Sequence, residues 1–396
     1  MHYRLYGIPA GLYPGKARSY LRKQGIDFVD VAPGSKFFQE RVLPAMHRWI
    51  NPVLETPEGA LIQDTVDIID HFERGPAQNL VRFSAYPTTP KHLAISHLFE
   101  MFGGEGLIRP AMHYRWNFNK EHLDFIKSEF ALCFPQHLSQ KEVNAAFTRG
   151  SAHLREATVN LGVTAESIPV IEESFLEWLN LFSAHLADHQ YLLGAHATLG
   201  DYGLIAPLWQ HLFRDPVPSM LIKRHAPLVG RWVERMASTQ PYFLEHDDPE
   251  TLIANDAVPD SLLAMMRFVA EEYLPEIRAH VDCANRWLEQ NPDIEPWTNG
   301  LKDPGARGLG GGSGLGAGEM ASFDWRGLKI KTGVLPYRFL LLQRLQDAVA
   351  LASPADQEKV RSMFRCAGIE ELLDLRTTRR VERKDNLEVW GPNLPD

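Results

Sequence analysis

The chain of 396 residues contains little cysteine and no motif that would use it. Its three cysteines, Cys133, Cys283 and Cys366, lie far apart, and no Cys-x-x-Cys spacing occurs that would form a zinc site or a redox pair. The sixteen histidines also lack ligand spacings such as His-Glu-x-x-His, so we expect no metal. Sparse, dispersed cysteines are typical of a reducing compartment.

Two further absences limit the partners that we expect. The formal net charge is −9, whereas a nucleic-acid surface needs a concentrated basic patch, so we expect no nucleic acid. The chain has no run of about eighteen apolar residues, and its N-terminal apolar stretch is too short for a signal-peptide core. We therefore expect no membrane partner and a cytoplasmic protein. The length favours two or three folding units.

What the sequence does contain is a regular order of elements near its start. Residues 3–9 follow a strand pattern that stops at the turn Gly-Ile-Pro-Ala-Gly, residues 14–23 follow a helical pattern, and residues 28–31 form a second strand pattern. Residues 50–73 add a hairpin around Thr-Pro-Glu-Gly and an amphipathic helix that starts at Asp64. The predicted order is β-α-β, hairpin, helix.

This order, together with the residues that occupy it, resembles the thioredoxin-like N-terminal domain of cytosolic glutathione S-transferases. The family's third strand begins with a cis proline, here Pro52, and the backbone of the next residue, here Val53, pairs with the cysteinyl part of glutathione. The family's pair that binds the γ-glutamyl group aligns with Gln63 and Asp64. The resemblance therefore implies glutathione as co-substrate. Serine or threonine is commoner than Asp64 at its position. An aspartate would repel the γ-glutamyl carboxylate but bind its ammonium, and it also suits a helix N-cap.

The resemblance leaves open which group would stabilise the glutathione thiolate. The thiol has a pKa of about 8.5, so an enzyme must favour its anion. The slot that holds serine or cysteine in many family members falls at Gly11, which has no side chain. Tyr6 and Tyr13 lie nearby and would either donate a hydroxyl or simply pack. A third alternative is that the backbone amides of residues 11–13, at a helix N-terminus, hold the thiolate.

Helical periodicity dominates from Lys91 onward. The candidate helices are 91–103, 105–120, 121–131, 139–160, 166–187, 200–214 and 222–237. Thr198 and Asp201 form a capping-box pattern that resembles the start of the family's buried core helix, so we expect Asp201 to be structural. In this fold the helix 105–120 lines the electrophile site, which makes Met112, His113 and Trp116 candidates for the substrate pocket. Ordinary packing and inter-subunit contacts are the alternative.

The last third of the chain lies beyond the resemblance. Residues 258–290, 334–352, 354–366 and 369–375 follow helical patterns, and the charged tail is expected to fold back through Val389 and Trp390. The glycine-rich residues 308–318 lack the preceding strand of a dinucleotide fingerprint and are interpreted as a linker or hinge. No catalytic constellation occurs here.

These patterns predict an α/β plus all-α protein in four parts. Residues 1–76 form a thioredoxin-like, glutathione-binding domain and 77–90 a linker. Residues 91–250 form an all-helical domain similar to the C-terminal domain of the transferases. Residues 251–396 form a mostly helical extension with a Gly/Pro-rich linker at 291–320.

The resemblance implies a homodimeric glutathione transferase of the detoxification type, in which the thiol attacks a small hydrophobic electrophile. Another glutathione-dependent enzyme, such as an ether lyase, isomerase, peroxidase or dehalogenase, is one alternative, because the same thiolate serves each reaction. The other is a non-catalytic module that binds glutathione or a protein partner, since a fold does not fix an activity.

Overall fold

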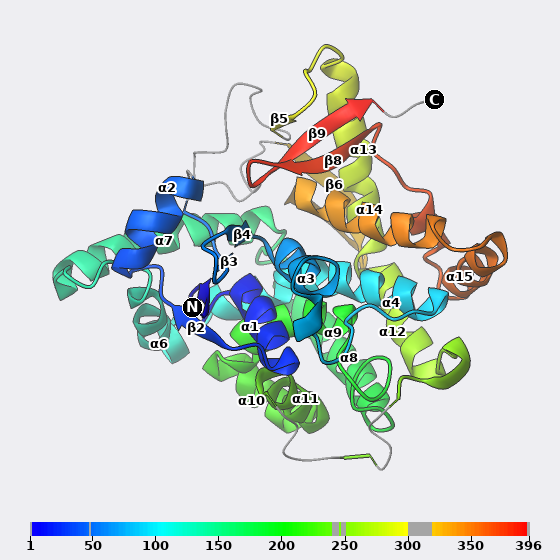
Figure 1. Ribbon diagram of the computed structural model, residues 1–396, viewed down its shortest axis with the longest axis horizontal. Coiled ribbons are helices and arrows are strands. Elements are labelled where there is room, and N and C mark those ends of the chain that lie inside the picture. Colours follow the sequence, from blue (N-terminus) through cyan, green and yellow to red (C-terminus); the bar gives the residue numbers. More distant parts are fainter. Residues whose placement is uncertain (1, 47–48, 240–244, 247–250, 300–318, 394–396) are drawn as a thin grey trace.

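The first unit of the computed structural model is a four-stranded sheet with the order β2-β1-β3-β4 (Figure 1). The structure describes residues 2–46, 49–239, 245–246, 251–299 and 319–393. β1 pairs with β2 in parallel and with β3 antiparallel, and β3 pairs antiparallel with β4. The elements are β1 (Tyr3–Tyr6), α1 (Leu12–Gln24), β2 (Phe28–Val31), a π-helical turn (Phe38–Val42), α2 (Leu43–Met46), β3 (Val53–Glu55), β4 (Leu61–Gln63) and α3 (Thr65–Glu73). The predicted thioredoxin-like order is confirmed.

Alternation along β1 and β3 divides the residues between the two faces of this sheet. Leu5 and Leu54 are buried in the main core together with residues of α1 and α3. Tyr6 and Val53 instead join a smaller cluster with Phe38 of the π-helical turn. The sheet is therefore covered on both faces, by α1 and α3 on one face and by the π-helical turn on the other.

The helical domain follows, and its helix α9 packs against α4 and against α1 of the first unit. Its elements are α4 (Pro90–Met101), a π-helical turn (Phe102–Gly106), α5 (Ile108–Trp116), α6 (Asn119–Ala131), α7 (Gln140–Asn160), α8 (Ile168–Leu186), α9 (Leu199–Pro207), a second π-helical turn (Leu208–Phe213), α10 (Pro216–His225) and α11 (Pro227–Ala237). The predicted helix 222–237 is two helices, because Pro227 disfavours helical backbone at Ala226. Among the described residues, no helix is both long and apolar enough to cross a membrane.

The extension contains more strand than the sequence predicted. Its helices are α12 (Asp260–Glu272), α13 (Leu274–Gln290), α14 (Pro336–Ala350) and α15 (Pro354–Cys366), and its strands are β5 (Thr298–Asn299), β6 (Met320–Trp325), β7 (Leu328–Gly333), β8 (Arg379–Lys384) and β9 (Leu387–Asn393). β6 and β7 form a hairpin, and β5, β9 and β8 form a small sheet. Two adjacent positive φ angles, at Asp385 and Asn386, turn β8 into β9, and a mostly helical interpretation overlooked this turn. The predicted linker or hinge at 308–318 lies outside the described residues.

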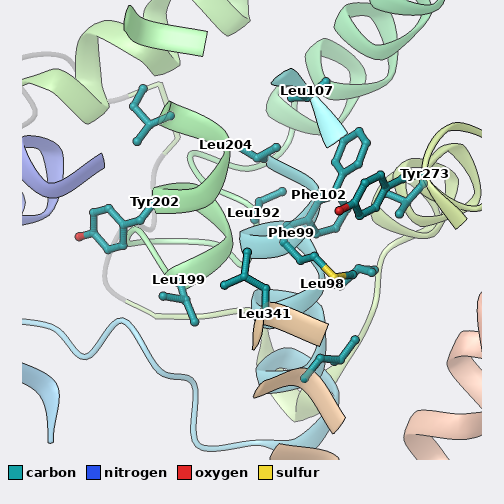
Figure 2. Packing of buried hydrophobic residues seen from close by; sticks show 14 of the residues in the cluster. Leu98, Phe99, Phe102, Leu107, Leu192, Leu199, Tyr202, Leu204, Tyr273 and Leu341 are labelled. Carbon is teal, nitrogen blue, oxygen red and sulfur yellow. The ribbon is translucent and has the colours of Figure 1, made fainter. Parts of the chain in front are cut away.

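The extension shares one core with the helical domain. Figure 2 shows Leu341 of α14 and Tyr273, which lies between α12 and α13, in the same cluster as Leu98 and Phe99 of α4 and Leu204 of α9. All five side chains are buried. As expected, Val389 and Trp390 pack back on the body, and Trp390 is fully buried. The extension is thus an integral part of the fold.

Candidate functional site

The corner where β3 and β4 lead into α3 carries four of the predicted binding residues. The Asn51–Pro52 peptide bond is cis, as predicted. Val53 is buried, and in the sheet register it lies between Tyr6 and Gln63. Asp64 is the N-cap of α3, and its carboxylate accepts a hydrogen bond of 2.9 Å from the amide of Val66.

Asp64 also has an unusual backbone conformation. Its φ is 83° and its ψ is 146°, a region that non-glycine residues rarely adopt. Such a conformation costs about 1–3 kcal/mol and persists only where the surroundings determine it, most often at functional sites. This conformation places a carboxylate at the positive end of α3, beside β3, which follows Pro52.

The second half of the candidate site is the start of α1. Gly11 is the N-cap of this helix. A Cβ at Gly11 would lie only 2.8 Å from the Pro14 ring and 3.1 Å from Ile8, so a serine would not fit there without a shift. Arg115 of α5 holds the preceding segment, because its guanidinium donates to the carbonyl of Ala10 at 3.1 Å.

Sequence reasoning did not place Arg115 in the site, and it missed this link. Arg115 is buried and forms a two-pronged ion pair of 2.6 and 2.8 Å with buried Asp215. A buried guanidinium with a carboxylate partner keeps its geometry, so this pair fixes the approach to α1. The sequence signal was only an arginine within an otherwise buried helix.

Neither candidate tyrosine has a free hydroxyl. The Tyr6 hydroxyl donates to Glu55 at 2.6 Å. The Tyr13 hydroxyl donates to Glu105 at 2.7 Å. Burial and the carboxylate partner raise the pKa of each phenol above its ordinary value. Both phenols therefore stay protonated, and their protons are already engaged.

Glu105 belongs to a buried chain of charges that the sequence did not reveal. Arg338 of α14 lies 3.3 Å from Glu105 and donates to Glu276 at 2.6 Å, and Arg109 donates to Glu276 at 2.6 Å. All four side chains are at most 3% exposed. Burial raises the pKa of Glu105, whereas at Glu276 the two arginines outweigh burial and hold the pKa at about 2. These buried ion pairs and the hydrogen bond from Tyr13 to Glu105 link the start of α1 to the extension.

The extension also reaches the predicted γ-glutamyl residues. The hydroxyl of Tyr337 donates to Asp64 at 2.9 Å. Arg383 of β8 donates to the side-chain oxygen of Gln63 at 2.5 Å and to Asp67 at 3.0 Å. The signal for this contact was charge complementarity, because the basic tail faces a helix that carries Asp64, Asp67 and Asp70.

The three predicted pocket residues do not converge on one surface. Met112 and Trp116 are buried in a cluster with Ile126, Phe147 and Leu161. His113 is also buried, and its Nε2 lies 3.1 Å from Glu172 of α8. Their role in an electrophile pocket stays a prediction. Among the described residues, no cluster of His, Cys, Asp or Glu has the arrangement of a metal site.

Comparison with known proteins agrees with this architecture. Residues 169–240 match the family model of the glutathione S-transferase C-terminal domain. Similar solved structures include the beta-etherase LigF from Sphingobium sp. strain SYK-6, with 17% identity over 60% of this chain and 95% of that chain and a TM-score of 0.43. Glutathione transferase GSTFuA3 from Phanerochaete chrysosporium shares 14% identity over 61% and 98%, with a TM-score of 0.41. FzlA from C. crescentus shares 17% identity over 60% and 88%, with a TM-score of 0.32. No curated protein sequence matched.

The thioredoxin-like sheet, the cis proline, the capped core helix and the matched domain define a class, the transferase fold of two domains. Residues 169–240 therefore match the C-terminal domain of the glutathione S-transferases, and the chain carries an additional region C-terminal to this match.

Proposed function

We propose that the chain is a glutathione transferase, which binds glutathione between β3 and the N-termini of α1 and α3 and directs its thiol at a small hydrophobic electrophile. The strained backbone of Asp64 carries this proposal. The Asp64 carboxylate is fixed at the N-terminus of α3, beside β3. It suits the ammonium of the γ-glutamyl group, which needs an anionic partner. The family's fold supports the remaining contacts.

Backbone amides are the group best suited to stabilise the thiolate. The amides of Leu12 and Tyr13, in the first turn of α1, have no acceptor within the helix and lie at its positive end, whereas the Gly11 amide already donates to the carbonyl of Ile8 at 3.2 Å. The hydroxyls of Tyr6 and Tyr13 are engaged by Glu55 and Glu105. Pre-aligned N–H donors favour a developing or full anion without any further side chain.

The test is glutathione binding by calorimetry, together with the ultraviolet absorbance of the bound thiolate across pH. We expect binding with a lowered thiol pKa. Asp64→Asn retains the N-cap but removes the charge, so we expect it to weaken binding at least about tenfold. Asp347→Asn, which breaks an exposed pair with Arg380, is the matched control and should bind as the parent does. Equal binding by the Asp64 variant would contradict the proposal.

One observation favours a second candidate, a glutathione-binding protein without turnover. Tyr337 and Arg383 contact the same Asp64 and Gln63 that glutathione would use. Binding with an unshifted thiol pKa, and no conjugation of a hydrophobic electrophile, would select this candidate. Binding with a lowered pKa would select the transferase.

We also propose a cytoplasmic homodimer. The large apolar side chains of Val29, Phe37 and Trp49 are 50%, 57% and 46% exposed, and Val29 lies on the edge strand β2 of the first sheet. Apolar side chains at a sheet edge favour burial in an interface. Sedimentation equilibrium of the parent and of Phe37→Ser tests the dimer, and a monomeric parent would refute it.

A further inference from the structure

We propose that Tyr337 and Arg383 are built-in occupants of the γ-glutamyl subsite, so that glutathione binds only by displacing their side chains. This inference rests on the proposed glutathione site. It concerns the regulation of that site, because the affinity for glutathione would depend on whether these two side chains leave the subsite.

Tyr337 contacts both halves of the candidate site. Its hydroxyl donates to Oδ1 of Asp64 at 2.9 Å, the same oxygen that accepts from Val66. Its ring meets the ring of Tyr13 edge-on, with 6.3 Å between the centroids. The side chain therefore extends from the thiol end of the site to the γ-glutamyl end. An incoming ammonium and the Tyr337 hydroxyl would compete for one carboxylate.

Arg383 covers Gln63, the residue before Asp64. It donates to Gln63, and its charge is met by Asp67 at 3.0 Å and by Glu388 at 2.5 Å. Two carboxylates already neutralise this guanidinium, so it offers little attraction for the carboxylate of a γ-glutamyl group. This arrangement distinguishes an occupant from an additional ligand-binding arginine.

The helix that carries Tyr337 is fixed. Arg338, the next residue, is buried between Glu276 and Glu105, and Leu341 lies in the main core. Displacement is therefore confined to the side chains of Tyr337 and Arg383, while the backbone of α14 stays in place. An occupant of this kind lowers the apparent affinity by the fraction of molecules in which the subsite is open.

The experiment is calorimetric titration of the full chain with glutathione. We compare the parent with Tyr337→Phe, which removes only the competing hydroxyl, and with Arg383→Gln. We expect each variant to bind about tenfold more tightly, as a lost hydrogen bond to a charged group implies. Arg380→Gln is the matched control, because Arg380 lies on the same strand but pairs with Asp347, and its affinity should equal that of the parent.

The outcomes separate the two proposals. Unchanged or weaker binding by Tyr337→Phe, in a variant whose circular dichroism and melting match the parent, overturns the inference and makes Tyr337 a bystander or a ligand. The glutathione site itself survives that result if Asp64→Asn still weakens binding. If neither the parent nor any folded variant binds glutathione, the proposed function fails and the inference fails with it.

Discussion

At the scale of single residues, the candidate site is already paired within the protein. Tyr13 donates to Glu105, Tyr337 donates to Asp64, and Arg383 donates to Gln63. Buried polar groups need such partners, because an unpaired one costs about 1–3 kcal/mol. A ligand that binds to Asp64 or Gln63 must therefore replace a hydrogen bond that these side chains already make within the protein.

Replacing Tyr13 by phenylalanine separates catalysis from structure. The Tyr13 hydroxyl donates to buried Glu105, and the pKa of the Tyr13 phenol is raised. We therefore expect Tyr13→Phe to leave the pKa of the bound thiol unchanged. The variant should lose about 1–3 kcal/mol of stability, since Glu105 loses a donor. Thiolate absorbance and urea unfolding measure the two effects. A rise of the thiol pKa in the variant would instead make the hydroxyl the stabilising group.

His185 predicts acid sensitivity away from the site. Its Nε2 donates to the carbonyl of Leu192, and its Nδ1 lies 2.9 Å from the hydroxyl of Ser261. Burial lowers its pKa to about 4, compared with 6.5 when unfolded. The contribution of neutral His185 to the free energy of unfolding is fully present above pH 6.5. It is lost as the pH falls from 6.5 toward 4, and the loss amounts to at most about 3 kcal/mol.

Thermal melting across this pH range measures the effect. His185→Gln keeps one donor and one acceptor but does not titrate, so its melting temperature should fall less between pH 7 and pH 4 than that of the parent. Equal slopes for parent and variant would show that other groups govern the acid limb.

At the scale of elements, two capping boxes differ in burial and so should differ in energy. Asp201 of α9 accepts from the amides of Leu192 and Thr198 and from the indole of Trp232, all inside the core. The box formed by Ser139 and Glu142 at α7 is exposed. We expect Asp201→Ala to cost about 3 kcal/mol or more, because several buried donors lose their acceptor, and Glu142→Ala to cost much less. Equal losses in urea unfolding would contradict this.

Local signals sufficed for those elements that are specified locally. Turn glycines, Pro52, the Asp64 cap and the Thr198–Asp201 box each act over a few residues, and the structure confirms them. The β6–β7 hairpin was missed although its side chains alternate between buried and exposed. Its alternation is local, but its burial depends on α13 and on the distant segment around Val163 and Ile171.

No local sequence pattern predicted that residues of the extension contact the site. Tyr337 contacts Asp64 across 273 positions, and Arg383 contacts Gln63 across 320. A helical period places residues on a face but does not state which distant face they meet. Only the charge complementarity between the basic tail and the acidic start of α3 could have pointed to the contact, and it was not used to predict the contact from the sequence.

At the scale of the whole molecule, the buried charges tie three regions into one unit. Lys16 of α1 pairs with Glu100 of α4 at 2.7 Å, and Tyr13 reaches Glu105, which Arg338 links to Glu276 of α13. Because α14 also packs in the core beside α4, the extension and the two transferase-like regions should unfold together. Loss of one central charge then affects the entire molecule.

Arg338→Met tests this unity. The substitution leaves Glu276 and Glu105 buried without their shared cation, and breaking a buried pair from one side costs about 3–5 kcal/mol. Arg380→Met, which breaks a half-exposed pair, should cost at most about 1 kcal/mol. Urea unfolding followed by fluorescence and by far-ultraviolet circular dichroism should show one coincident transition in each protein, at lower urea for Arg338→Met. Two separated transitions in the parent, or equal losses in both variants, would mean that the extension folds independently. In that case Tyr337 and Arg383 would belong to a unit that can separate from the rest of the molecule.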